Sequence, residues 1–213
     1  MRQSAILASG AAALLTLAAP VTAATTVVAE TDDSWDVTRP DGTTSDARIV
    51  TSVPASWGSP VPGTAWISTN TTGRNTTPGL YTFTKTFDLA DASSFNFLTA
   101  IWKADNFITD LILNGTSLGS FGTTNEFGNV GPFTRTFSLA DAGATFLNTG
   151  NTLQVVIQQR DLGNNNGNDT GLSGRFIAAV PEPGTWMLMI LGLGAVGFAM
   201  RRRPKVTVRF QHA

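Results

Sequence analysis

Short stretches rich in β-branched and aromatic residues recur between residues 24 and 180, and clusters of Gly, Pro, Asn, Asp and Ser separate them. No part of this region keeps the 3.6-residue hydrophobic periodicity of an amphipathic helix. Many short strands at such spacing are typical of an antiparallel β-sandwich, so the sequence predicts an all-β fold. The expected strands lie at about 47–53, 64–69, 80–88, 95–102, 106–113, 117–121, 132–139, 153–160 and 173–180.

One hairpin has a clear turn signal. The strand-like run from Phe107 to Leu113 ends at Asn114-Gly115, and this dipeptide readily adopts the positive φ angles of a type I′ turn. We therefore expect the chain to reverse here.

A ten-residue segment occurs twice, as FTKTFDLADA at residues 83–92 and as FTRTFSLADA at residues 133–142. A solenoid needs at least three copies, so we interpret the two copies as matching edges of one sandwich. Lys85 and Arg135 share the parity of the phenylalanines, which conflicts with a purely apolar core face. The conflict would disappear if both strands lay at a sheet edge, where the charged ends of these side chains could reach solvent.

The first 23 residues have the composition of a secretory signal peptide. Arg2 precedes an apolar run at residues 6–19, and the small residues Val21 and Ala23 match a signal-peptidase site. We therefore expect export through the Sec translocon and cleavage after Ala23. The alternative, a buried amphipathic helix, would need a polar face that this run does not have.

The C-terminal region has three parts in a fixed order. Pro181-Glu182-Pro183 is followed by Trp186 within an uncharged stretch at residues 184–200, and then by a basic cluster. Seventeen uncharged residues are at the lower limit for crossing a bilayer, so we predict a single transmembrane helix with the basic cluster in the cytoplasm. The basic cluster consists of Arg201, Arg202 and Arg203.

This order of motif, apolar segment and basic cluster resembles the PEP-CTERM sorting signal in its PEPxxW variant, also named the ice-binding protein C-terminal domain. The resemblance covers residues 181–203 and implies a Gram-negative bacterium that produces exopolysaccharide. It implies that an exosortase-type enzyme recognises Pro181-Glu182-Pro183 after transient inner-membrane insertion and releases the protein toward the cell surface. A plain membrane anchor is the alternative. The basic tail at residues 204–213 extends beyond the usual end of such signals.

The middle region resembles galactose-binding-like jelly rolls. An ADN turn at residues 104–106, an LNG hairpin at 113–115 and a GNTL strand start at 150–153 follow in that order, and residues 164–176 resemble the closing loop and strand. The resemblance implies a jelly-roll sandwich over residues 24–180. It implies no particular ligand, because this fold has many unrelated functions.

Residue types and charge exclude several function classes. The chain has no cysteine, and its single histidine is His212, so histidine triads, cysteine nucleophiles and zinc sites with nitrogen or sulfur ligands are not expected. Residues 24–183 hold all 15 acidic residues but only eight basic ones, a net charge of −7. Such a charge gives no support to nucleic-acid binding, which needs a strongly basic face. Carboxylates for glycoside hydrolysis are present, but no spacing singles out a pair, so we expect no enzyme.

The loop at residues 161–169 is rich in the oxygen ligands that calcium takes. Its spacing does not match an EF-hand, and Asn, Asp and Gly are common in any turn. We therefore expect a structural loop without a cofactor, with structural calcium as the alternative. The calcium ligands would be Asp161, Asn164, Asn166 and Asp169.

Two surface ligands are further candidates. Trp57 lies in a loop rich in Pro, Gly and Ser at residues 53–63, where an indole can stack on a sugar, whereas Trp66 and Trp102 lie within strand patterns typical of core positions. Thr82, Thr84 and Thr86 would line one strand face as an ice-binding ladder, but Thr favours solvated strands in general.

The sequence thus predicts a signal peptide (1–23), a β-sandwich (24–180), a sorting signal (181–203) and a basic tail (204–213). We expect an exported, non-enzymatic protein of the cell surface or extracellular matrix, associated with exopolysaccharide or biofilm. The alternatives are a dedicated carbohydrate-binding module and, more distantly, a carboxylate-dependent glycoside hydrolase.

Overall fold

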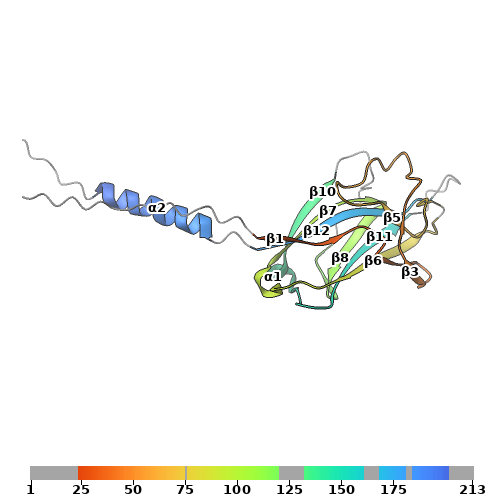
Figure 1. Cartoon of the computed structure of the whole chain (residues 1–213), viewed down its shortest axis with the longest axis horizontal. Coiled ribbons are helices and arrows are strands. Elements are labelled where there is room, and N and C mark those ends of the chain that lie inside the picture. The colour runs from red at the N-terminus through yellow and green to blue at the C-terminus, as the bar shows by residue number, and fades with distance from the viewer. Residues whose placement is uncertain (1–23, 75, 120–131, 161–167, 181–183, 202–213) are drawn as a thin grey trace, which may run out of the picture. The chain divides into compact units, whose positions relative to one another are not determined.

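The computed structural model describes residues 24–74, 76–119, 132–160, 168–180 and 184–201 (Figure 1). The strands lie in one compact unit, Ala23–Pro181, and the helix that follows the sandwich belongs to a second unit. Within the described residues, the strands form two six-stranded sheets. Sheet A contains β1 (Thr25–Glu30), β4 (Arg48–Ile49), β5 (Ile67–Ser68), β7 (Phe97–Asp105), β10 (Phe133–Ser138) and β12 (Gly171–Ala179). Sheet B contains β2 (Asp36–Thr38), β3 (Thr44–Asp46), β6 (Gly79–Phe87), β8 (Phe107–Leu113), β9 (Thr116–Ser117) and β11 (Asn151–Gln159).

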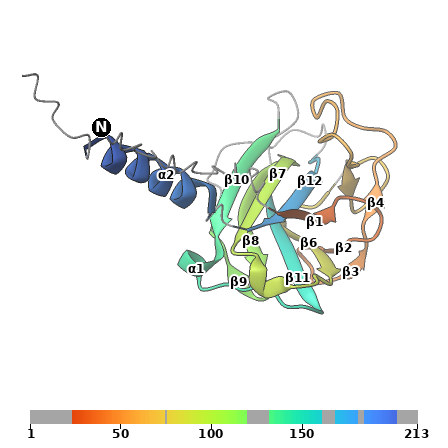
Figure 2. The same ribbon diagram turned by 60° about the vertical axis from the view of Figure 1, so that its left-hand side comes forward.

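The strand order in sheet A is β10-β7-β12-β5-β4, with β1 also paired to β12, and in sheet B it is β3-β2-β6-β11-β8-β9 (Figure 2). Every pairing is antiparallel. The all-β sandwich predicted from the sequence is therefore confirmed.

The core lies between the two sheets because inward-facing positions recur at every second residue of a strand. On β11, Leu153, Val155 and Ile157 are fully buried, and the residues between them are partly exposed. Phe83 of β6 lies opposite Val155 and is also fully buried. Substitution of these positions by polar residues would therefore bury unpaired polar groups.

The predicted hairpin is confirmed. β8 and β9 pair through Leu113 and Thr116, and the two turn residues have positive φ angles, 51° at Asn114 and 80° at Gly115. The Asn114 side chain also accepts a hydrogen bond from the Thr152 backbone N–H at 2.8 Å and donates one to the Thr145 carbonyl at 2.8 Å. Asn114 therefore joins the turn to the neighbouring strand.

The repeated segment occupies two different environments. Its second copy forms β10 at the edge of sheet A, as expected, but its first copy forms β6 in the interior of sheet B, between β2 and β11. The prediction of two matching edges is therefore only half right. The two sequences are alike because each strand turns one face to the core. This requirement is the same for an edge strand and an interior strand.

The two copies also end differently because of one residue. Ser138 caps the short helix α1 (Leu139–Ala142), and its hydroxyl accepts a hydrogen bond from the Asp141 N–H. The equivalent Asp88 instead accepts from Gly150 N–H at 2.8 Å, and the chain continues into the 3₁₀ turn η1 (Ala92–Ser94).

The charged residues of the repeat have partners near the surface, where their charged ends reach solvent. Lys85 Nζ lies 3.8 Å from the Asp32 carboxylate and donates to the Ser34 hydroxyl. The Arg135 guanidinium lies 5.0 Å from the ring centre of Phe137. Both cations can therefore share a face with phenylalanines without a bare charge in the core.

The sequence did not predict β1, β2 and β3, nor the short helices η1 and α1. These three strands are short or largely exposed, and most of their pairing is to distant strands, β12 and β6. Conversely, the strands expected at 47–53 and 64–69 shrink to two residues each, because the chain between them leaves the sheet.

The predicted C-terminal helix is present as α2 (Gly184–Arg201). Of the helices in the described part of the chain, none combines the length and apolar character needed to cross a membrane. The structure therefore does not show the predicted transmembrane span. Ala23 and the predicted signal peptide lie outside the described residues.

Candidate functional site

The C-terminal segment begins inside the sandwich. β12 ends at Ala179, and the next residue, Val180, donates its backbone N–H to the Ala24 carbonyl at 3.1 Å. Trp186 and Arg201 lie within α2. The remaining predicted sorting residues, which lie outside the described part of the chain, are Pro181, Glu182, Pro183, Arg202 and Arg203.

The segment at residues 50–66 covers part of the outer face of sheet A. Its backbone is tied to that face by the Val61 N–H, which donates to the Ser173 hydroxyl at 2.8 Å, and by Lys103 Nζ, which donates to the Ser59 carbonyl at 2.9 Å. Beneath it lies a small second core formed by Val50, Trp57 and Trp66.

Trp57 is fully buried in this second core. Its ring centre lies 4.6 Å from that of Trp66, and the ring covers Gly171 and Gly73 so closely that a Cβ at either glycine would overlap it. A buried indole has no face to offer to a sugar. The structure therefore places Trp57 in a supporting role beneath the 50–66 segment and not at a glycan-binding surface.

A buried polar cluster lies against Trp57, at the junction of β7 and β8. The Trp57 indole N–H donates to Asp105 Oδ2 at 2.5 Å. Asn106 Nδ2 donates to Asp105 Oδ1 at 2.5 Å, to Gln159 Oε1 at 2.6 Å and to the Asp169 carbonyl at 3.2 Å. Thr170 Oγ1 donates to the same Gln159 oxygen at 3.0 Å.

Burial dominates the electrostatics of this cluster. It raises the pKa of Asp105 to about 7; the hydrogen bond from Trp57 opposes this shift, and the nearby Asp169 carboxylate adds to it. Burial likewise raises the pKa of Asp169, which Arg74 partly offsets. Asp169 Oδ1 is buried and has no hydrogen-bond partner among the described residues. Burial thus favours the protonated form of the Asp105 carboxyl.

The sequence did not single out Asp105, Asn106 or Gln159. The available signal is the ADN turn at residues 104–106, which indicates a turn and, with the LNG and GNTL motifs, a jelly roll, but no polar cluster. Of the predicted calcium ligands, Asp169 lies beside this cluster, while Asp161, Asn164 and Asn166 lie outside the described residues. The residues that the structure describes contain no group of three or more acidic or histidine side chains able to hold a metal ion.

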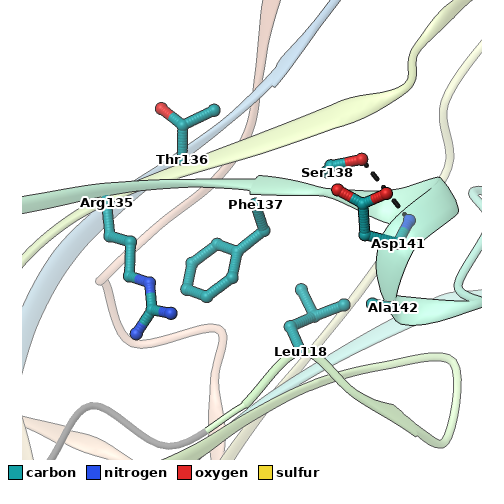
Figure 3. A pocket seen from close by; sticks show the side chains of 7 residues that line it. All are labelled: Leu118, Arg135, Thr136, Phe137, Ser138, Asp141 and Ala142. Atoms are coloured by element: carbon teal, nitrogen blue, oxygen red, sulfur yellow. Dashed lines mark hydrogen bonds between the residues drawn. The ribbon is translucent and has the colours of Figure 1, made fainter.

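A separate, open pocket of about 250 Å³ lies beside the edge strand β10. Figure 3 shows Arg135, Phe137 and Leu118 around one hollow, with Thr136 on the opposite side of the strand. The pocket combines a cation, an aromatic ring and hydroxyl or carboxylate oxygens, a set that suits a small polar ligand. Its lining residues are Leu118, Arg135, Thr136, Phe137, Ser138, Asp141 and Ala142.

Comparison with known proteins identifies the C-terminal segment. Residues 179–203 match the family model of the PEP-CTERM protein-sorting motif. No curated protein matches the chain significantly. Among solved structures, the chain is similar to a Bifidobacterium dentium beta-glucuronidase complexed with coumarin-3-O-glucuronide, at 16% identity and a TM-score of 0.39. That match covers 74% of this chain and 30% of the glucuronidase, so the chain spans less than a third of its length. The chain therefore carries a PEP-CTERM protein-sorting motif that begins at the last residue of β12.

Proposed function

We propose that the protein is exported, recognised by an exosortase-type enzyme and delivered to the cell surface or the extracellular matrix. The observation that carries this proposal is the PEP-CTERM motif at residues 179–203. The route requires the Sec translocon, signal peptidase at Ala23 and a transient stay of the C-terminal segment at the inner membrane. In this proposal the motif is a substrate of the sorting machinery, and the sandwich is the delivered part.

A pulse-chase experiment with a C-terminal epitope tag tests the sorting. We expect the wild-type chain to lose the tag in cells that contain an exosortase-type enzyme. The variant with Pro181, Glu182 and Pro183 all replaced by Ala should keep it. Pro204→Ala, a matched proline change outside the matched segment, should lose the tag like the wild type. A wild-type chain that keeps its tag would rule out the proposal.

We further propose that the delivered sandwich associates with exopolysaccharide without turning it over. The outer face of sheet B supports this role, because Thr84 on β6 lies directly opposite Gln154 on β11, and Thr86 opposite Thr152. Hydroxyl and amide groups hydrogen-bond to neutral sugars, and a region of net charge −7 favours neutral over anionic chains. Co-sedimentation of the protein with purified neutral polysaccharide and, separately, with anionic polysaccharide tests this preference for neutral chains.

The alternative is a dedicated carbohydrate-binding module, and the pocket beside β10 is the observation that favours it. Asp141 is exposed at its rim, and Asp91 is the equivalent residue in the other copy of the repeat, outside this pocket. Binding on a glycan array that Asp141→Asn abolishes and Asp91→Asn retains would establish the pocket as the binding site. If the wild-type protein binds no glycan on the array, the binding-module alternative fails and the matrix-protein proposal remains.

A carboxylate-dependent glycoside hydrolase is the more distant alternative. Its two acids would be Asp105 and Asp169, because the Asp169 charge raises the pKa of Asp105, yet Asp105 lies buried beneath Trp57. A substrate would need to displace the 50–66 segment to reach it. Release of reducing sugar by the purified protein, lost in Asp105→Asn, would favour the enzyme.

A further inference from the structure

The N-terminal and C-terminal strands of the sandwich lie side by side. β1 pairs antiparallel with β12, and Thr25 lies opposite Ala179 while Thr26 lies opposite Ala178. The pairing continues one step further, because the Val180 N–H donates to the Ala24 carbonyl at 3.1 Å. On its other side, Ala179 lies opposite Phe97 of β7.

The first residues of the sorting motif are therefore part of the folded sheet. The match begins at Ala179, a residue of β12 that has strands on both sides. Only residues 181–183 separate Val180 from the start of α2 at Gly184. The motif thus has no long linker between it and the sandwich, and β1 holds its first two residues.

We propose that β1 acts as a clamp on the beginning of the sorting motif, and that this clamp limits the rate at which the sorting enzyme processes the chain. This inference rests on the proposed sorting function. One common way to bind an extended peptide is to add it as a strand, through main-chain hydrogen bonds to the peptide. The backbone groups of residues 178–180 already bond to β1 and β7, so an enzyme can engage them only after β1 opens.

β1 is the element of this ladder that opens most easily. Thr25, Thr26 and Val27 are all exposed, Val27 to 49%, and the register shifts between Val27 and Ala29. Among the described strands, β12 is its only partner in sheet A. β12, by contrast, pairs with β7 along its whole length. Local opening of an exposed edge costs less than global unfolding, so release of β1 is the step that would control access.

Two neighbouring threonines provide a matched test. In an antiparallel pair, hydrogen-bonded and non-hydrogen-bonded positions alternate. Because Ala24 and Val180 are a bonded pair, Thr26 and Ala178 are the next one, and the Thr25 N–H points away from β12. Proline at position 26 therefore removes a ladder bond, whereas proline at position 25 does not, since an edge strand tolerates proline where the N–H faces outward.

The experiment is pulse-chase of the full-length tagged chain in cells that contain the sorting enzyme. Loss of one bond, worth about 1 kcal/mol, should raise the rate of C-terminal processing in Thr26→Pro about fivefold, while Thr25→Pro stays within about twofold of the wild type. A second variant, with Gly-Ser-Gly-Ser inserted between Val180 and Pro181, leaves the ladder intact and should also be processed faster. Protease resistance of the sandwich shows whether Thr26→Pro folds. If it does not fold, the insertion variant alone tests the clamp.

Unchanged or slower processing in both the insertion variant and a folded Thr26→Pro would overturn the clamp while leaving sorting intact. Equal acceleration in Thr25→Pro and Thr26→Pro would also overturn it, because the effect would then not depend on the ladder bond. A wild-type chain that keeps its tag would overturn the sorting proposal and the clamp together.

Discussion

Trp57 and Asp105 are 48 residues apart in the chain, and the indole N–H of the first donates to the carboxyl oxygen of the second at 2.5 Å. Both groups are buried, so each satisfies a polar atom that water cannot reach. This bond fixes the 50–66 segment onto the end of β7. The second core and the polar cluster are consequently one structural unit.

Replacement of Trp57 by Phe should lower the free energy of unfolding by about 1–3 kcal/mol, because it leaves a buried Asp105 oxygen without its donor. Urea unfolding followed by fluorescence or circular dichroism measures this change. Trp66→Phe is the matched control. The Trp66 indole donates to the Gly58 carbonyl at 3.1 Å, so this variant leaves a neutral acceptor without its donor, whereas Trp57→Phe leaves a carboxyl oxygen without one. Equal stability of Trp57→Phe and the wild type would contradict the importance of this bond.

The stability of the sandwich should fall as the pH rises from about 4 to about 7. The pKa of Asp105 is about 7 in the folded protein, against 3.8 for an aspartate free of such surroundings, so the folded state binds the proton more tightly. The contribution of Asp105 to the free energy of unfolding is fully present below the pKa of the unfolded state. It is lost as the pH rises through the pKa of the folded state, and the total loss is at most about 4 kcal/mol. Asp169, whose pKa burial also raises, contributes in the same direction.

Urea midpoints measured between pH 4 and pH 8 test this dependence. Asp105→Asn should flatten the profile, because the amide does not titrate, although its own NH₂ group would meet Asn106 Nδ2. A profile of the wild type that rises with pH over this range would refute the prediction.

Gly171→Ala should destabilise the protein by about 1–3 kcal/mol, since overpacking forces neighbours to move. A Cβ at Gly171 would overlap the ring of Trp57, which the polar cluster and Trp66 hold in place. Gly174→Ala on the same strand is the control: its Cβ would meet the Phe176 ring at 3.2 Å, and we expect a smaller loss. Thermal unfolding of both variants measures the difference, and equal melting temperatures would argue against a rigid Trp57.

Variants at Asn114 should rank in stability as wild type, then Asn114→Gly, then Asn114→Ala. Glycine keeps the positive φ of 51° but loses the side-chain bonds to Thr152 and Thr145, at a cost of about 1–3 kcal/mol. Alanine loses the same bonds and adds the strain of a left-handed conformation, about 1 kcal/mol more. Chemical denaturation gives the order; a more stable alanine variant than glycine variant would contradict it.

Local sequence signals predicted the parts of the fold that local chemistry decides. The Asn114-Gly115 turn and the alternation along β11 were readable because neighbouring residues determine both. The repeated segment shows the limit. Its two copies have nearly the same sequence, yet one lies inside sheet B and the other at the edge of sheet A, because partner strands distant in the chain decide the position.

The site was less predictable for the same reason. The loop composition around Trp57 suggested exposure, but the ring is buried because residues 50–66 fold back over Gly171, more than 100 residues later. The cluster of Asp105, Asn106 and Gln159 joins two strands and a third segment, and no spacing in the sequence reveals it. The sorting motif, by contrast, is read as a linear sequence, so it was found directly.

The position of β12 also determines how the sandwich bears mechanical load. A pull on the C-terminal end enters the molecule along β12, across its nine register pairs with β7 and its five with β1, because the inter-strand hydrogen bonds lie perpendicular to the strands. Such a load shears many hydrogen bonds at once, instead of peeling them apart one by one. A domain attached by this end would therefore unfold slowly under tension, a property governed by its unfolding rate and not by its equilibrium stability.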